Sequence, residues 1–361
     1  MQSDNSQKKS ALKVNEGIEQ PDAINKTFLN SLKSKQSKPK IASYYLDGIL
    51  KGNITVLSQA ITLIESTLKE HQIIAEEIVE ACLPYSGNSI RLGITGVPGV
   101  GKSTIIETLG KHITSQNKKL AVLAIDPSSR LSRGSILGDK TRMEELSINP
   151  SAFIRPSPSA GNLGGVARKT RETIILCEAA GYNVIFVETV GVGQSETTVK
   201  DMVDFFLLLM LAGAGDELQG IKRGIMEMAD MLIINKADGN NYKNALSAKA
   251  EYESALRLFP PTDSKWTPTV EVCSALTGLN ISNIWDTINN YILVTKANSY
   301  FETNRSQQQK KCLHDTLIHA IIENINSNPN LAKQIQENEK LVMDLKISPY
   351  KAAKKIIRLF K

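Results

Sequence analysis

The chain has 361 residues, 41% of them hydrophobic. Because a domain usually has about 150 residues, this suffices for a full hydrophobic core. Its longest apolar run, Phe205 to Ala212, is far short of the roughly 18 residues that a membrane span needs, so no membrane span is predicted. The net charge of +6 is confined to the two ends, since residues 1–40 carry +4 and residues 346–361 carry +6, and the body at −4 argues against binding of nucleic acid.

Residues 1–40 are polar, rich in Lys, Ser, Asn and Gln, and lack the apolar segment of a secretory signal. They predict a disordered basic tail. The four cysteines are scattered, with no metal-binding spacing, and are typical of a reducing compartment (Cys82, Cys177, Cys273 and Cys312). We therefore expect a cytoplasmic protein.

Apolar positions from Ile41 to Cys82 recur at helical intervals, and Pro84 and Gly87 end the pattern. This predicts an N-terminal helical segment over residues 41–87, which leads into the first strand.

Short apolar runs alternate with helical stretches over residues 88–296. The candidate strands are Ile90–Thr95, Leu120–Ile125, Val184–Glu188, Phe205–Leu211, Met231–Asn235 and Val270–Ser274. Such alternation is typical of an α/β fold with a mostly parallel sheet and helices on both faces. Loops at the carboxyl ends of the strands then form the binding site.

The first strand leads into a glycine loop with the pattern G-x-x-x-x-G-K-[ST], and a helical stretch follows. The loop consists of Gly96, Val97, Pro98, Gly99, Val100, Gly101, Lys102 and Ser103, and Thr104 comes next. Inward-turned backbone N–H groups would bind phosphates, Lys102 would neutralise the β- and γ-phosphates, and the Ser103 hydroxyl would ligate Mg²⁺. A tight glycine turn without a ligand is the alternative, and the flanking strand and helix argue against it.

Two carboxylates end neighbouring candidate strands. Asp126 closes the second strand and is placed to hold Mg²⁺ or its waters, although a helix-capping or turn role stays open. Glu188 begins Glu-Thr-Val-Gly, which resembles the D-x-x-G switch of GTPases, with Gly191 meeting the γ-phosphate. Small Ras-like GTPases place a water-orienting Gln after this glycine, whereas here Val192 follows, so we expect slow intrinsic hydrolysis.

Guanine is favoured as the base by Asn235, Lys236 and Asp238, which form the N-K-x-D signature at the end of an apolar strand. The Asp carboxylate can accept hydrogen bonds from N1–H and the 2-amino group of guanine, which adenine does not offer. The run Ser274-Ala275-Leu276 resembles the S-A-x segment that supports the base. Together these motifs predict GTP rather than ATP.

The segment Gly213–Lys222 contains several glycines around Asp216 and Glu217, which suits a loop that changes conformation. A plain connection between strand and helix is the alternative.

Residues 297–361 are helical again, with a break near Asn326–Pro329 and a restart at Ser348-Pro349, where Ser can cap and Pro can occupy the first turn. In the last helix, Ala352, Ile356 and Phe360 form an apolar stripe among basic residues. This face could pack on protein or touch a membrane. Membrane anchoring usually needs a larger apolar face, so packing on protein is favoured.

Five stretches resemble the methylmalonyl-CoA mutase-associated GTPases. They are Ile94–Thr108, Leu123–Met143, Arg155–Gly165, Glu188–Glu196 and Ala212–Lys222. The dense part of the resemblance covers roughly residues 43–295, and the C-terminal helices match more loosely. The family lies in the dimeric metallochaperone (SIMIBI) class of P-loop NTPases, so the resemblance implies this type of G domain.

The resemblance implies that GTP hydrolysis gates delivery of adenosylcobalamin to methylmalonyl-CoA mutase and protects that enzyme. It implies that Lys102, Ser103, Asp126, Asp139 and Glu188 form the phosphate and Mg²⁺ site. It also implies that the segment Gly213–Lys222 reports nucleotide state to the mutase, with Lys222 contributing to hydrolysis, and that the C-terminal helices build a homodimer.

Four alternatives remain. Another acyl-CoA mutase could be the partner. A nickel-delivery GTPase would use His- or Cys-rich tracts, whereas the four His here are dispersed. A transport-linked kinase would need protein-kinase motifs, which the sequence lacks. A nucleotide-stabilised scaffold would show no turnover.

Overall fold

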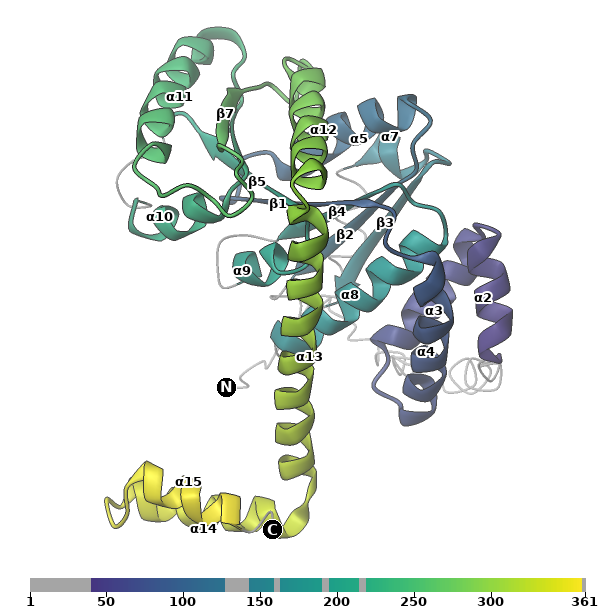
Figure 1. Cartoon of the computed structure of the whole chain (residues 1–361), viewed down its shortest axis with the longest axis vertical. Helices are drawn as coiled ribbons and strands as arrows, with labels where there is room; N and C mark the ends of the chain where they lie inside the picture. The colour runs from purple at the N-terminus through teal and green to yellow at the C-terminus, as the bar shows by residue number, and fades with distance from the viewer. Residues whose placement is uncertain (1–39, 127–142, 159–162, 190–194, 214–218, 359–361) are drawn as a thin grey trace, which may run out of the picture. The chain divides into compact units, whose positions relative to one another are not determined.

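The computed structural model describes residues 40–126, 143–158, 163–189, 195–213 and 219–358 (Figure 1). Residues Ile41–Lys361 form one compact unit, and residues 1–39 of the expected tail lie outside the described residues. The strands are β1 (Ile90–Gly96), β2 (Leu120–Asp126), β3 (Ala152–Pro158), β4 (Val184–Thr189), β5 (Phe205–Leu211), β6 (Met231–Asn235) and β7 (Thr269–Val272). The helices are α2 (Ala42–Leu50), α3 (Ile54–Glu65), α4 (Lys69–Cys82), η1 (Leu83–Tyr85), α5 (Lys102–Ser115), α7 (Glu144–Ser147), α8 (Leu163–Ala179), α9 (Ser195–Lys200), α10 (Gln219–Met228), η3 (Gly239–Asn241), α11 (Tyr242–Leu256), α12 (Ile281–Ala297), α13 (Tyr300–Ser327), α14 (Pro329–Met343) and α15 (Pro349–Ile357).

The strands form one parallel sheet in the order β3-β2-β4-β1-β5-β6-β7. Ile94 of β1 lies opposite Glu188 of β4 on one side and Leu207 of β5 on the other. The strand order reverses at β1, and ligands of such folds bind outside the carboxyl ends of the strands at this point. The expected α/β fold is therefore confirmed, and the phosphate loop lies at its usual place.

Two hydrophobic cores cover the two faces of the sheet, because successive strand residues point to opposite faces. In β2, Leu123 and Ile125 join the core that includes α8 and the N-terminal helices. Leu120 and Val122 join the other core, which includes α5 and α12 (Figure 1). Burial on both faces explains why the central strand β5 has a continuous apolar sequence.

The six strands expected from the sequence are all present, with ends shifted by at most two residues. The sequence analysis missed β3, because Arg155, Pro156 and Pro158 interrupt its apolar pattern. This strand lies at the edge of the sheet and pairs with β2, so the missing N–H groups of its prolines are tolerated.

The N-terminal helices α2, α3 and α4 pack on one another and on α8. Their helical spacing buries Ile49, Leu57, Ile61 and Ile78 in the core. Asn53 begins α3, and its side chain accepts hydrogen bonds from two backbone N–H groups of the first turn.

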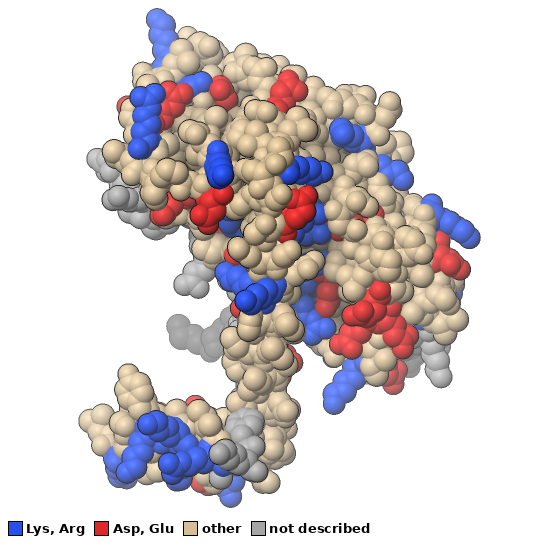
Figure 2. Space-filling view, in the orientation of Figure 1, with Lys and Arg blue, Asp and Glu red and all other residues tan. Residues whose placement is uncertain are grey.

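The last two helices begin at the capping residues that their sequence favours. Ser348 caps α15 with Pro349 in the first turn, as predicted, and Asn328 caps α14. Figure 2 shows Lys and Arg gathered over α14 and α15. Among the described residues, no helix combines the length and the apolar character required to cross a membrane.

Candidate functional site

The phosphate loop connects β1 directly to α5. Gly96, Gly99 and Gly101 adopt φ values of +153°, +76° and +96°, which side chains other than glycine's strain to reach. Gly101 forms the N-cap of α5, so the helix begins at Lys102 and directs its positive dipole end toward the loop.

Two of these glycines also permit close packing of the loop. A Cβ atom on Gly96 would lie 2.6 Å from the Leu209 carbonyl oxygen of β5. A Cβ atom on Gly101 would lie 2.7 Å from Nδ2 of Asn235. The loop is therefore fitted against β5 and against the predicted base-binding motif.

We expect Gly101→Ala to weaken nucleotide binding by about tenfold or more, because the clash adds to roughly 1–3 kcal/mol of backbone strain. Gly181→Ala is the matched control, since Gly181 has a φ of +83° and no atom within 4 Å of a built Cβ. Calorimetric titration with guanine nucleotide should separate the two variants. Equal affinities would contradict the proposed role of the loop.

Lys102 lies across the phosphate loop. Its Nζ donates hydrogen bonds to the carbonyl oxygens of Gly96 at 2.8 Å and Val97 at 3.3 Å. Burial lowers the pKa of Lys102 below its ordinary value, while the nearby Glu188 and Glu196 carboxylates act in the opposite direction. A partly desolvated ammonium that donates to neutral carbonyl oxygens is well suited to take up phosphate oxygens.

The carboxylates expected at the metal site come from adjacent strands. Glu188 is buried near the end of β4, and Asp126 ends β2, which pairs with β4. Ser103 lies in the first turn of α5, which follows β1, and β1 pairs with β4. Hydroxyl and carboxylate oxygens are the donors that Mg²⁺ prefers, so these residues fit that ion chemically.

Several predicted residues are only partly described. The side chains of Asp126 and Lys222 lie outside the described residues, as do Asp139 and Gly191. The segment Gly213–Lys222 is described only at Gly213 and from Gln219 onward, where the helix α10 begins. Thr104 is exposed in the first turn of α5.

Asn235 joins the phosphate loop to the base-binding segments. Its side chain is 2% exposed, and Nδ2 donates to the Val100 carbonyl oxygen at 2.8 Å. Its Oδ1 accepts from the Ala275 backbone N–H at 3.2 Å and from Cys273 Sγ at 3.4 Å. One amide thus fixes two segments that would hold opposite ends of a nucleotide.

The Asp238 carboxylate is oriented by the segment after β7. Its Oδ1 accepts a hydrogen bond from Ser274 Oγ at 2.8 Å. Thr108 of α5 donates to the Ala275 carbonyl oxygen at 2.8 Å, which ties this segment to the helix of the phosphate loop. Lys236 adopts a φ of +62°, and Leu276 is exposed at the turn.

The structure thus brings together the phosphate loop, Glu188, the N-K-x-D motif and the S-A-x segment. It adds two features that the sequence analysis did not single out. Thr95 and Thr189 form a 2.7 Å hydrogen bond between the ends of β1 and β4. Glu196 is 1% exposed in α9 and interacts electrostatically with Lys102. Two sequence signals could have found these residues. Thr95 and Thr189 are polar residues at the ends of apolar strands, and Glu196 is an acid that closely follows the switch motif.

Comparisons with known proteins find similar proteins over most of the chain. The family model described as methylmalonyl-CoA mutase-associated GTPase MeaB matches residues 57–330. A probable GTPase of Mycobacterium tuberculosis is 47% identical over 308 residues, which cover 85% of this chain and 92% of that protein. The mouse mitochondrial protein called methylmalonic aciduria type A homolog is 43% identical over 324 residues, covering 87% and 78%. The crystal structure of LAO/AO transport system kinase superposes with a TM-score of 0.72 at 34% identity, covering 90% and 99%.

Proposed function

Because the chain belongs to the methylmalonyl-CoA mutase-associated GTPase family, we propose that it gates delivery of adenosylcobalamin to methylmalonyl-CoA mutase and protects that enzyme. The chain is a P-loop GTPase, so the energy for this gating comes from GTP binding and hydrolysis. The observation that carries the nucleotide site is the hydrogen bonding of Asn235, which joins the phosphate loop to the segment that orients Asp238.

In the proposed site, each group has a separate task. Lys102 binds the β- and γ-phosphates, and Asp238 binds guanine. Ser103 and Glu188, together with Asp126 and Asp139, would hold Mg²⁺ and its waters. When bound, Mg²⁺ would neutralise charge that develops on the phosphoryl oxygens. The backbone N–H groups of the phosphate loop and of Gly191 would bind the remaining phosphate oxygens.

Hydrolysis by the isolated chain is proposed to be slow. Val192 stands where Ras-like GTPases have a water-orienting Gln. The missing group would come from the segment Gly213–Lys222, with Asp216, Gln219 or Lys222 as candidates and Lys222 as the one tested, once the mutase orders that segment. Mutase binding and GTP turnover are thereby linked.

Nucleotide-dependent complex formation tests the partner. We expect sedimentation velocity to show a complex between the chain and methylmalonyl-CoA mutase whose stability differs between GDP and a non-hydrolysable GTP analogue. Absence of a complex in both states would contradict this partner. The same test with other acyl-CoA mutases, together with assays for bound nickel and for transfer of radiolabelled phosphate to protein, distinguishes the alternatives.

A homodimer is proposed through α13. Its second half carries an exposed apolar face formed by Leu313, Leu317, Ile318, Ile321 and Ile322. Leu313, Leu317 and Ile321 are spaced four apart and are 59%, 50% and 55% exposed. Large apolar residues at this spacing are typical of a helix that packs against another helix. The family resemblance supports a second copy of the chain as the occupant.

We expect Leu317→Arg to raise the dimer dissociation constant by about 30-fold or more, since truncating or charging a central interface residue costs at least about 2 kcal/mol. Glu323→Arg is the control, because Glu323 is exposed on another face of α13. Light scattering coupled to size-exclusion chromatography would measure both. A Leu317→Arg protein that stays as dimeric as the control would contradict this interface.

A further inference from the structure

The helix α9 lies in the crossover that returns from the nucleotide-binding end of the strands to their other end. β4 ends at Thr189 beside the phosphate loop, and β5 starts at Phe205. Since the strands are parallel, the crossover between them runs back along the whole length of a strand. α9 and residues 201–204 make up the described part of this crossover.

The first end of α9 faces the phosphate loop. Glu196 is buried in its first turn and interacts with the Lys102 charge. Val199 and Val203 pack directly on Gly93 of β1, where an added Cβ would lie 2.9 and 3.0 Å from their methyl groups. No space separates α9 from the strand that carries the loop, so a shift of the strand end must move α9 or strain this contact.

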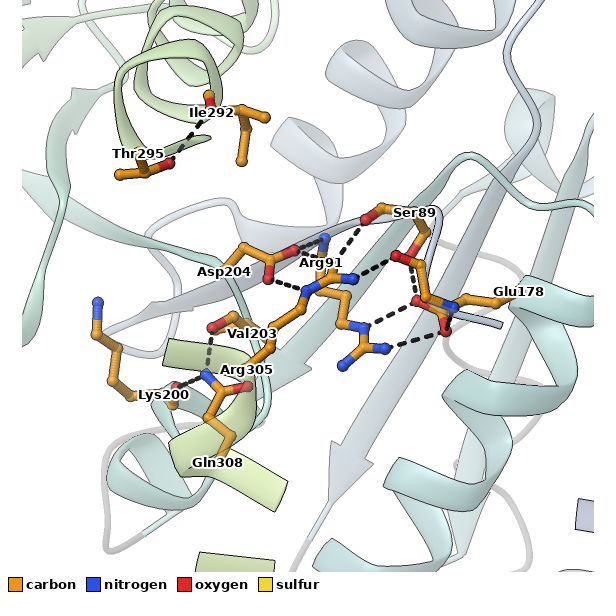
Figure 3. A network of polar contacts seen from close by, with 11 residues as sticks. Ser89, Arg91, Glu178, Lys200, Val203, Asp204, Ile292, Thr295, Arg305 and Gln308 are labelled. Carbon is orange, nitrogen blue, oxygen red and sulfur yellow. Dashed lines mark hydrogen bonds and ion pairs between the residues drawn. The ribbon is translucent and has the colours of Figure 1, made fainter. Parts of the chain in front are cut away.

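The second end of α9 is held by side chains of other helices. The last carbonyl groups of a helix lack intrahelical partners and need hydrogen-bond donors from elsewhere. Gln308 of α13 donates through Nε2 to the Val203 carbonyl oxygen at 2.8 Å and to that of Lys200 at 3.4 Å (Figure 3). Arg171 of α8 donates to the Asp201 carbonyl oxygen at 2.9 Å and to that of Gln308 at 3.0 Å.

Two ion pairs flank these contacts and also come from α13. Arg305 binds the buried Asp204 carboxylate with two hydrogen bonds of 2.7 Å (Figure 3). Lys311 binds the Asp201 carboxylate at 2.5 Å. Arg305, Gln308 and Lys311 are spaced three apart, so one face of α13 holds four of the five residues from Lys200 to Asp204.

We propose that α9 transmits nucleotide state from the phosphate loop to α13, with Gln308 and Lys311 as the residues that couple the two helices. The inference rests on the nucleotide site proposed above and adds a route from it to the helix that carries the apolar face. A contact network joins the two ends, and α9 is short enough to move as one body. By linkage, α13 must then also bias the choice between GDP and GTP.

Hydrogen exchange on the full chain tests the coupling. With wild type, we expect amides of residues 300–312 to exchange at rates that differ by about fivefold or more between GDP and a non-hydrolysable GTP analogue, the low end of typical allosteric coupling. Gln308→Leu and Lys311→Ala should each reduce this difference and shift the ratio of GDP to GTP-analogue affinity. Lys310→Ala is the matched control, because it removes an exposed neighbouring lysine and should change neither quantity.

Two results would overturn the proposal. One is equal exchange of residues 300–312 in both nucleotide states of the wild type. The other is a nucleotide-dependent difference that persists in Lys311→Ala, whose side chain is 55% exposed, and in folded Gln308→Leu. Calorimetry on the same samples separates failure of the site from failure of the coupling. If the wild type bound neither nucleotide, the site itself would be refuted.

Discussion

Replacing Lys102 by Ala should reduce GTP hydrolysis to background and weaken Mg²⁺·GTP binding by about 2–5 kcal/mol, the cost of removing one partner of a desolvated charge pair. In the structure, Lys102 Nζ donates hydrogen bonds to the neutral carbonyl oxygens of Gly96 and Val97, and burial depresses its pKa. A phosphate would bring negative charge into direct contact with this ammonium.

Calorimetry and phosphate release would measure the effect, with circular dichroism to show that the variant is folded. Lys111→Ala is the control, because Lys111 lies on the same helix and is half exposed in an ion pair with Glu145. Unchanged turnover in folded Lys102→Ala would contradict the assignment of this loop to phosphate binding.

Asp238→Asn should change the base specificity of the site from guanine to xanthine. Guanine offers two N–H donors to the Asp238 carboxylate, and an Asn amide leaves one of them facing another donor. Each unmatched buried group costs about 1–3 kcal/mol, so GTP affinity should fall by about 10- to 100-fold or more. Xanthine has a carbonyl at that position and can accept from the new amide.

Competition binding with GTP, xanthosine triphosphate and ATP would measure the change. Asp286→Asn serves as the control, since Asp286 is exposed on α12. Equal affinity of the wild type for ATP and GTP would contradict the base assignment. A variant that retains the wild-type order of affinities would contradict the role of Asp238 in particular.

Much of the fold was predictable because its signals are local. Apolar runs predicted six strands, and the phosphate loop carries its glycines, lysine and serine within eight adjacent residues. β3 was missed because an edge strand can contain proline and arginine, so its sequence resembles a loop. Its pairing with β2 is set by tertiary structure rather than by propensity.

The parts of the site that could not be predicted depend on contacts between distant residues. Asn235 was predicted as part of the guanine-binding motif, but the bond from its side chain to Val100, which lies 135 positions earlier, was not predicted. The bond from Gln308 to Val203 spans 105 positions. No periodicity or motif encodes such a pair, since either residue alone is an ordinary polar side chain.

The rate of GTP hydrolysis with and without methylmalonyl-CoA mutase tests the central proposal most directly. Because Val192 replaces the water-orienting Gln, the chain alone should turn over slowly. Added mutase should accelerate hydrolysis, and a group supplied in trans can contribute about 10³-fold or more in other GTPases. Lys222→Ala should blunt this acceleration while the intrinsic rate and GTP affinity stay nearly unchanged. A rate that saturating mutase leaves unchanged in the wild type would contradict the proposed coupling between GTP turnover and the mutase.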